Sequence, residues 1–507
     1  MRLQYILFCL GLFVVASCYD DLGNYDYHEI NEIKVVGGIA EEYSAYTMVD
    51  TLKIQPELSF SQDSATTGRF EYAWSITPAT LGVGKTTKIS DQRDLVYPVN
   101  LPRATYILTF GVKDKETKVE WSTKTYLNVT TLFTNGWLML GEKDGHAALD
   151  MVSISTLGDT MVITDVLKNS GLPPLKGPRK MISINYRENP SWPWMNGCFL
   201  MTDDGTFEMD RVSMTSDVST NMRGSVYDPE ISSDFAGSDM LQSSYCRYLI
   251  GDNKLYINNS LSSSGTFGNP ANKYDKYSTT YFKVFPEIIW GGSSWGAYLS
   301  GSQMIYDMDG KRFAKFKNTS VNCDTLPDNA GDPYTWKTGN DMIALFNSKF
   351  LSSGSQTSYA VMKSPDNRYY LYSFQPALSA GPKKGNKYDI TSLPDIAQAT
   401  KFAFSDRYPY MLYVVGAKLY ACEFLSSGIT HKELDGFGTD PITMLYFDTY
   451  KEYGKDVFYV ATYNDQTKGT VQKYRLKDDP NDIQIEAVKD SRWKNLCKVT
   501  SMCWKWY

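Results

Sequence analysis

Short stretches of alternating or continuously apolar residues recur along the chain, and Gly, Asp, Asn, Ser and Pro separate them. Long runs with the 3.6-residue period of an amphipathic helix are hard to find. Alternation with period two places successive side chains on opposite faces of a strand, and short apolar runs bounded by turn residues suit buried strands. The pattern therefore predicts an all-β protein.

Residues 31–131 are expected to form a first domain, an immunoglobulin-like β-sandwich. Its central strand carries Trp74, and a buried Trp between two sheets is the usual core of such a sandwich. Strands are expected at residues 51–58, 70–76, 95–99, 106–113 and 120–129.

Three of these strands resemble the PKD subclass of immunoglobulin-like domains. The sequences are YAWSI at residues 72–76, YILTFGVKD at 106–114 and YLNV at 126–129. The resemblance covers about 100 residues, close to the size of an immunoglobulin-like domain. It implies a spacer or an interaction module.

Residues 132–507 repeat one pattern, in which a strand meets a two-residue turn and a second strand follows. Gly and Asn tolerate the positive φ that tight hairpins require. The turns recur roughly every 50 residues, which in an all-β chain predicts four-stranded propeller blades. They are Asp144-Gly145, Asp204-Gly205, Asp252-Asn253, Gly301-Ser302, Asp366-Asn367, Gly416-Ala417 and Lys468-Gly469.

The two ends of this region predict that the propeller closes on itself. Residues 498–507 resemble the first strand of a further repeat, but no hairpin follows them. The first hairpin, at residues 137–154, has no propeller strand before it. Pairing the C-terminal strand with this hairpin would remove the exposed sheet edges. Seven blades fit the spacing best, with six or eight as alternatives.

The N-terminus predicts a lipoprotein. Residues 1–17 have a basic start, a short apolar run and small residues before Cys18, as a signal peptide does. Residues 15–18, VASC, fit a lipobox, so Cys18 is expected to carry acyl chains that hold the protein to outer-membrane lipid. Residues 18–30 would then be a tether. A cleaved peptide with an incidental cysteine is the alternative.

Asp20 and Asp21 directly follow the predicted lipid-bearing cysteine. They resemble the acidic export signal of Bacteroidetes lipoproteins, which implies an outer-membrane location facing the cell exterior. The alternative is an ordinary solvated tether.

Composition and motifs exclude several kinds of chemistry. The net charge is −6 at pH 7, without the basic surface that nucleic acid requires. The three histidines have no metal-ligand spacing, and no P-loop, GxSxG or dinucleotide-binding motif is present. We therefore expect no metal, no cofactor and no nucleic-acid partner. The six cysteines after Cys18 are scattered, and buried free thiols are expected, with a Cys497–Cys503 pair as the alternative.

Carboxylate catalysis is the rival hypothesis, because paired acids need no proximity in sequence. Asp406 and Asp448 follow strands that would lie near the propeller axis, although acids at strand ends are commonly turn formers. The segment TDDGTF at residues 202–207 resembles the Asp box of sialidases, but it lacks one residue and does not recur. It is interpreted as a hairpin turn.

Two connections rich in tryptophan are the candidate binding surface. PSWPW at residues 190–194 and IWGGSSW at residues 289–295 occupy the same position in their repeats, so they are expected on one propeller face. Exposed indoles stack on sugars and anchor protein interfaces. The alternative is that they pack beneath their own loops; Trp336 is a weaker candidate. The candidates are Trp192, Trp194, Trp290 and Trp295.

Two segments resemble PKD-like family lipoproteins of Bacteroidetes. They are CYDDLGNYDY at residues 18–27 and NGWLMLGEKDG at residues 135–145. The resemblance implies an accessory surface protein of a nutrient-uptake system with a SusC-like TonB-dependent transporter and a SusD-like lipoprotein, and it brings no catalytic residues.

Three functions remain open at this point. The preferred one is a non-catalytic surface lipoprotein that binds a glycan, a peptide or the transporter itself. The second is a propeller glycoside hydrolase or lyase with carboxylates in its funnel. The third is a structural subunit whose propeller contacts only proteins.

Overall fold

The architecture is known from a computed structural model of the chain. It describes residues 31–62, 68–80, 84–154, 160–184, 196–243, 246–259, 265–290, 302–317, 320–352, 355–376, 381–425, 428–448, 451–452, 454–477 and 482–506. The chain divides into two units, Met1–Thr130 and Thr131–Tyr507.

The first unit is built from three sheets that share one core. The largest has the strand order β2 (Glu42–Tyr46), β9 (Glu120–Thr130), β8 (Ala104–Asp114), β5 (Phe70–Pro78), β6 (Thr87–Ser90). The two smaller sheets pair β1 (Ile33–Gly37) with β4 (Glu57–Phe60) and β3 (Thr51–Ile54) with β7 (Leu95–Pro98). The expected strand 51–58 is therefore two strands, which separate at Gln55-Pro56 because proline has no amide hydrogen for a ladder.

Trp74 is the centre of this core, as the sequence predicted. Its side chain is fully buried, its ring lies 4.7 Å from that of Phe110, and its indole N–H donates to the Arg93 carbonyl at 3.0 Å. The Tyr106 hydroxyl donates to the Pro102 carbonyl four residues upstream, at 2.8 Å. A tyrosine bonded back to the preceding turn is a hallmark of immunoglobulin-like sandwiches.

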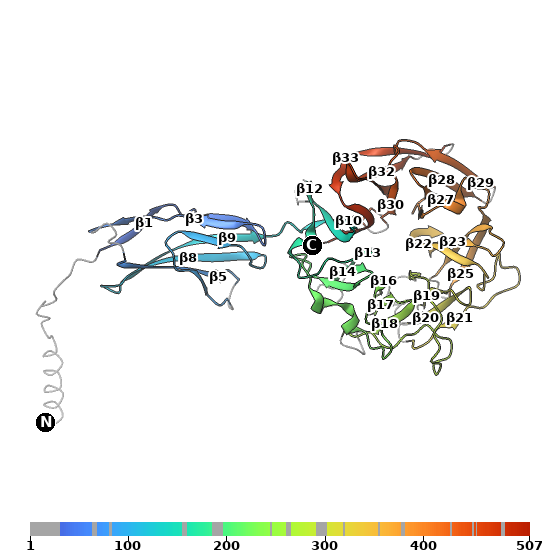
Figure 1. Cartoon of the computed structure of the whole chain (residues 1–507), viewed down its shortest axis with the longest axis horizontal. Helices are drawn as coiled ribbons and strands as arrows, with labels where there is room; N and C mark the ends of the chain where they lie inside the picture. The colour runs from blue at the N-terminus through green and yellow to red at the C-terminus, as the bar shows by residue number, and fades with distance from the viewer. Residues whose placement is uncertain are drawn as a thin grey trace, which may run out of the picture. The chain divides into compact units, whose positions relative to one another are not determined.

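The second unit is a β-propeller, and its described residues form seven sheets arranged in a ring (Figure 1). The first sheet has the order β34–β10–β11–β12 and combines both ends of the unit: β10 (Asn135–Lys143), β11 (His146–Ile154), β12 (Thr160–Ile163) and β34 (Lys498–Lys505). Three sheets of three strands follow: β13 (Pro178–Ile184), β14 (Gly197–Thr202) and β15 (Gly205–Met209); β16 (Gly237–Ser243), β17 (Cys246–Gly251) and β18 (Lys254–Asn259); β19 (Ser302–Asp307), β20 (Arg312–Lys317) and β21 (Asp324–Thr325).

The last three sheets have four antiparallel strands each. They are β22 (Asp341–Ser352), β23 (Ser355–Lys363), β24 (Tyr369–Gln375) and β25 (Lys383–Asp389); β26 (Lys401–Phe404), β27 (Tyr410–Val415), β28 (Lys418–Leu425) and β29 (Gly428–Leu434); β30 (Ile442–Phe447), β31 (Val457–Asn464), β32 (Lys468–Lys477) and β33 (Gln484–Leu496). Helices among the described residues are short 3-10 turns: η1 (Val166–Asn169), η3 (Val218–Thr220), η4 (Met222–Ser225) and η5 (Ile396–Gln398). None of them has the length or apolar character to cross a membrane.

The ring closes through the pairing that the sequence predicted. β34 runs antiparallel to β10, with Trp137 opposite Trp504 and Met139 opposite Met502. A cluster of buried side chains fills the space between the first and last sheets, including Trp137, Tyr459 and Trp504. Closure leaves neither end strand with an unpaired edge at the junction.

Each sheet presents one strand to the middle of the ring. β34, β13 and β16 contact one another in turn, as do β22, β26, β30 and β34. In the fourth sheet this place is taken by the irregular segment 284–290, because Phe285 and Ile289 donate backbone hydrogen bonds to Tyr306 and Met304 of β19. We call these seven segments the inner strands.

Several of the predicted hairpin turns are present, one is displaced by a residue and two are wrong. Asp144-Gly145, Asp252-Asn253 and Gly416-Ala417 connect paired strands directly. The turn expected at Asp204-Gly205 is formed by Asp203-Asp204, and Lys468-Gly469 lies within β32, paired with Asn464 and Tyr463. The turn expected at Gly301-Ser302 is wrong: Ser302 begins β19, and the chain reverses at residues 308–311 instead. Gly301 lies outside the described residues.

Candidate functional site

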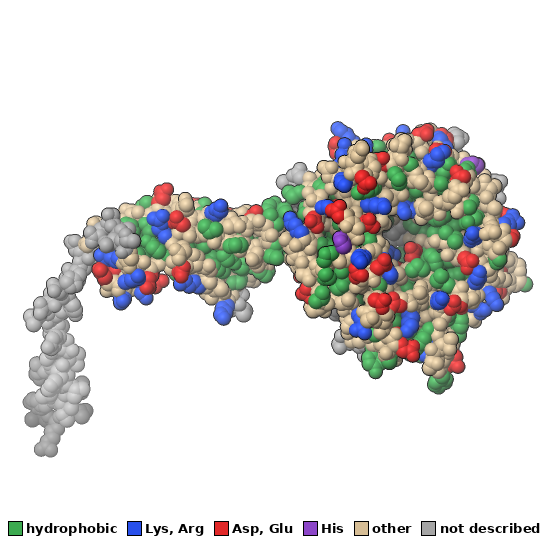
Figure 2. Space-filling view, viewed as in Figure 1, with side chains coloured by type: hydrophobic (Ala, Val, Ile, Leu, Met, Phe, Trp, Pro, Cys, Tyr) green, Lys and Arg blue, Asp and Glu red, His purple; other side chains and the backbone are tan. Residues whose placement is uncertain are grey.

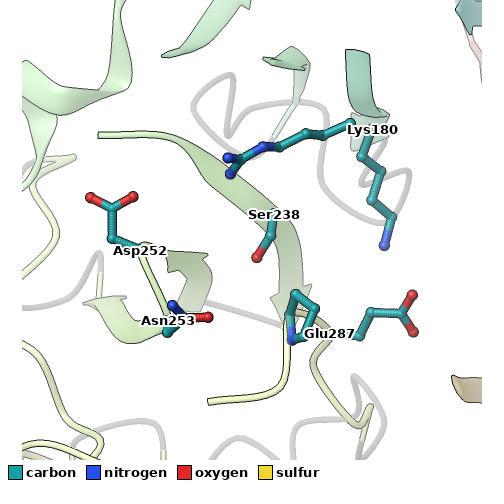
Figure 3. Close-up of a pocket in the computed structure, with 7 residues that line it drawn as sticks. Lys180, Ser238, Asp252, Asn253 and Glu287 are labelled. Atoms are coloured by element: carbon teal, nitrogen blue, oxygen red, sulfur yellow. The ribbon is translucent and has the colours of Figure 1, made fainter. Parts of the chain in front are cut away.

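A polar cavity of about 450 Å³ lies where three neighbouring inner strands begin, and we call it the Glu287 cavity. Figure 2 shows acidic and basic side chains interspersed around the middle of the ring. The side chains that line the cavity come from three successive sheets (Figure 3): Arg179, Lys180, Ser238, Asp252, Asn253, Pro286 and Glu287.

The backbone that presents these groups is set by local sequence. Arg179 and Lys180 stand on β13, and Ser238 on β16. Asp252 and Asn253 form the turn between β17 and β18 with φ of 50° and 58°, values that Asp and Asn adopt more readily than other residues with side chains. Pro286 and Glu287 belong to the inner strand of the fourth sheet.

Asp239 ties the three inner strands together beside the cavity. One carboxylate oxygen accepts from Lys180 Nζ at 2.6 Å, and the other accepts from the Ile288 backbone N–H at 2.9 Å. Asp239 is only 8% exposed, so both oxygens are committed to these donors. A buried carboxylate satisfied from two directions fixes the relative position of the strands that supply the donors.

The charges of Lys180 and Glu287 depend on each other. Burial lowers the pKa of Lys180, but the carboxylates of Asp239 and Glu287 outweigh burial and raise this pKa above its ordinary value. Burial raises the pKa of Glu287 to about 7; the Lys180 charge opposes this rise and Asp239 adds to it. Lys180 therefore stays protonated and positively charged at neutral pH, while Glu287 exchanges its proton near neutral pH.

The Glu287 carboxyl is open to a ligand in this cavity. No side-chain hydrogen bond of Glu287 is formed within the described part of the chain, whereas Arg179 is held by Asp203 at 2.6 Å. In Figure 3 the ends of Lys180 and Glu287 project to the same side, away from Asp252 and Asn253. The arrangement offers a ligand one permanent positive charge, on Lys180, and one carboxyl, on Glu287, that can donate or accept a hydrogen bond.

The lining of the Glu287 cavity includes none of the predicted tryptophans. Trp290 ends the inner strand that carries Glu287, three residues further along, and is half-buried; its backbone N–H donates to Asn347 Oδ1 at 2.9 Å. Trp192, Trp194 and Trp295 lie outside the described residues, so the shared tryptophan face stays a prediction.

Trp336 is a core residue. It is 3% exposed and packs edge to face on Phe313, Tyr334 and Phe374. It therefore presents no indole face to a ligand.

The acids singled out from the sequence are structural. Asp406 accepts from the Gly454 N–H and Asp448 from the Glu452 N–H, each at 2.5 Å, and both carboxylates are buried. The segment 202–207 is a hairpin turn, in which Thr202 pairs with Gly205. These residues hold loops in place, as the turn-former alternative proposed.

Sequence reasoning missed Lys180, Asp239 and Glu287. Glu287 is a lone charge in an otherwise apolar run, VFPEIIW at residues 284–290, whereas Lys180 follows Arg179 in β13 and Asp239 lies in the mostly polar strand GSDMLQS. A charge that interrupts a buried run needs a partner, but the partners come from other repeats and only the ring brings them together. Among the described residues, no group of three or more His, Cys, Asp or Glu side chains could hold a metal ion.

Comparison with known proteins adds a family match for the N-terminal part. Residues 18–173 match the model of the PKD-like family. The PKD-like match covers the sandwich and continues through β10, β11 and β12 of the first propeller sheet. No curated protein sequence matches the chain.

Solved structures similar to this chain include proteins from Bacteroides. A quinonprotein alcohol dehydrogenase-like protein of Bacteroides thetaiotaomicron is 11% identical, with 92% of this chain and 99% of that chain covered and a TM-score of 0.26. An auxiliary nutrient binding protein of Bacteroides ovatus is 10% identical, with 94% and 92% covered and a TM-score of 0.28. YCF48 of Cyanidioschyzon merolae is 10% identical, with 64% and 88% covered and a TM-score of 0.38.

Proposed function

We propose that the protein is a non-catalytic lipoprotein of the bacterial outer-membrane surface. Acylated Cys18 anchors it in the lipid, and the propeller captures a polar ligand, a glycan or a peptide. It acts beside a SusC/SusD-type TonB-dependent transporter, to which it delivers the ligand or on which it docks.

The Glu287 cavity is the observation that carries this proposal. Ligand sites combine a concave surface with a few fixed polar groups that orient the ligand. Here Asp239 holds Lys180 in place at 2.6 Å, and the Glu287 carboxyl beside it keeps its hydrogen-bonding capacity for a ligand. Hydroxyl and amide groups of sugars and peptides are suited to such a pair.

The N-terminal region supports the location at the membrane. The sequence before Cys18 has the order of a lipoprotein signal peptide, and the match to the PKD-like family begins at this cysteine. Several acyl chains on one cysteine would make a durable anchor, because each buried CH₂ contributes about 0.8 kcal/mol.

A glycoside hydrolase or lyase is the second candidate, and one observation favours it. A carboxyl with a pKa of about 7, as Glu287 has, suits a general acid. Hydrolysis with two carboxyl groups also needs a partner for Glu287. Of the two other acids here, Asp239 is occupied by Lys180 and Ile288, and the Glu287 carboxyl projects away from Asp252 (Figure 3), which favours binding over catalysis.

Co-purification from native membranes tests the proposal. The tagged full-length lipoprotein is expressed in its own cells, membranes are solubilised in mild detergent, and captured proteins are identified by mass spectrometry. A SusC-like and a SusD-like protein should be enriched over a Cys18→Ala variant, which would not reach the membrane. Recovery of neither partner at native expression would contradict the proposed complex.

A further inference from the structure

A second polar cavity, of about 510 Å³, lies between the last two propeller sheets. We call it the Arg492 cavity. It is bounded by the connection from β29 to β30, by β31 and β32, and by the end of β33. The lining residues are Gly436, Phe437, Gly438, Asp440, Thr462, Thr467, Thr470, Arg492, Lys494 and Asn495.

Its two cations stand on one side of β33. Arg492 and Lys494 are two residues apart, so their side chains leave the same face of the strand. Both are exposed, whereas Trp493 between them points into the hydrophobic core on the opposite face. No ion pair to either cation is formed within the described part of the chain.

The other polar side chains of the lining are neutral, except for one carboxylate. Three threonines line the cavity: Thr462, Thr467 and Thr470. The carboxylate, Asp440, accepts a hydrogen bond from Asn464 Nδ2 at 2.7 Å. Because the lining holds two cations and one carboxylate, its net charge is positive.

Two further lysines stand on inner strands, and one of them, Lys498, lies opposite Glu142 of β10. Lys498 begins β34 three residues beyond Asn495, and Lys401 begins the inner strand β26. Burial and the Lys498 charge lower the pKa of Lys401, so these two lysines are electrostatically coupled. Four cations therefore stand on three strands. Arg492 and Lys494 are on β33, the outer strand of the last sheet, and Lys498 and Lys401 are on the inner strands β34 and β26.

We propose that the Arg492 cavity binds an acidic sugar through its uronate carboxylate. Arg492 and Lys494 hold the charged oxygens, and the threonine hydroxyls bond to the sugar hydroxyls beside them. Arginine suits this role because its planar fork matches a carboxylate or sulfate with two parallel bonds. This inference rests on the proposed ligand-capture role and narrows it to acidic glycans.

Calorimetric titration of the purified protein, with its signal peptide and Cys18 removed, tests the inference. The ligands are glucuronate, glucose and inorganic sulfate at fixed ionic strength. Glucuronate should bind and glucose should not, and Arg492→Gln with Lys494→Gln should weaken glucuronate binding about tenfold or more. Lys489→Gln is the matched control, because it removes one charge of β33 whose side chain is 92% exposed.

The possible results separate the sources of the anion. Preference for glucuronate over sulfate supports the acidic sugar. Sulfate that binds as tightly as glucuronate means that the charge alone is recognised, which overturns sugar recognition. Absence of glucuronate binding by the wild-type protein overturns the proposed site. So does glucuronate binding by the double variant that equals that of the wild type, when the melting temperature of the variant is unchanged. None of these results depends on transporter co-purification, so this inference and the proposed complex fail separately.

Discussion

The indole rings of Trp137 and Trp504 meet edge to face across the junction of β10 and β34, with centroids 4.9 Å apart and planes at 72°. The two residues are the closing pair of the ring, although most of the propeller sequence separates them. Their contact joins the first and last sheets into one core with Tyr459. The closing strand β34 also contacts β13, the inner strand that carries Lys180.

Because β34 packs closely against β10 where the ring closes, we predict that Gly141 of β10 cannot be replaced by a residue with a side chain without loss of stability. A Cβ at this position would lie 2.2 Å from the Lys498 carbonyl oxygen, a backbone atom of the closing strand. Gly141→Ala should lower the free energy of unfolding by about 1–3 kcal/mol, as overpacking does. Gly224→Ala is the control, because a Cβ there meets nothing within 4 Å. Urea unfolding followed by tryptophan fluorescence measures both, and equal stabilities would contradict the closing contact.

Lys180 and Asp239 should be energetically coupled. Their charged hydrogen bond at 2.6 Å is partly buried, so a double-mutant cycle with Lys180→Met and Asp239→Asn should give a coupling of about 1–3 kcal/mol. Asp239→Ala should be more damaging than Asp239→Asn, because alanine also removes the acceptor for the Ile288 N–H. Additive effects in the unfolding free energy would show that the pair does not hold the inner strands together.

Glu287 should make stability fall as pH rises. The folded protein holds the Glu287 proton up to a pKa of about 7, whereas the ordinary value is 4.5. Between these two values the folded state binds more protons than the unfolded state, so this group's contribution to stability decreases through that window. Glu287→Gln should therefore be more stabilising, relative to wild type, at pH 8 than at pH 5. A difference that does not change with pH would contradict the environment described for Glu287.

The proposed lipid anchor depends on the Cys18 sulfur. Cys18→Ala should abolish incorporation of labelled palmitate and move the protein out of the membrane fraction, because no thiol remains at the lipobox to receive the acyl chain. Metabolic labelling followed by fractionation measures both effects. Cys246→Ala is a suitable control, since Cys246 is a buried free thiol in the propeller. Labelling that survives in the Cys18 variant would remove the lipoprotein assignment.

Much of the fold follows from the sequence because its determinants are local. The Asp252-Asn253 turn and the buried Trp74 each follow from residue type and neighbours, and closure follows from a strand without a hairpin at residues 498–507. The prediction of a turn at Gly301-Ser302 was wrong, because the inner strand of that sheet is irregular. Its sequence lacks the alternation of apolar and polar residues that marks a regular strand.

The candidate site follows from the sequence much less, because it is assembled from distant repeats. Lys180 and Asp239 are 59 residues apart, and Asp239 and Ile288 are 49 apart. Nothing in the spacing of single charges specifies which repeats become neighbours at the inner strands. The tryptophan loops were conspicuous in sequence, whereas the described polar cavity is built from residues that are individually unremarkable.

Ligand capture by the Glu287 cavity is tested most directly by affinity chromatography. The purified protein is immobilised and challenged with mixtures of oligosaccharides and of peptides, beside a Lys180→Met/Glu287→Gln variant whose fold is checked by its melting temperature. The wild type should retain a component of one mixture without altering its mass, and the folded variant should retain at least tenfold less. Equal retention by both proteins, or release of a cleaved product, would contradict a non-catalytic binding site at this cavity.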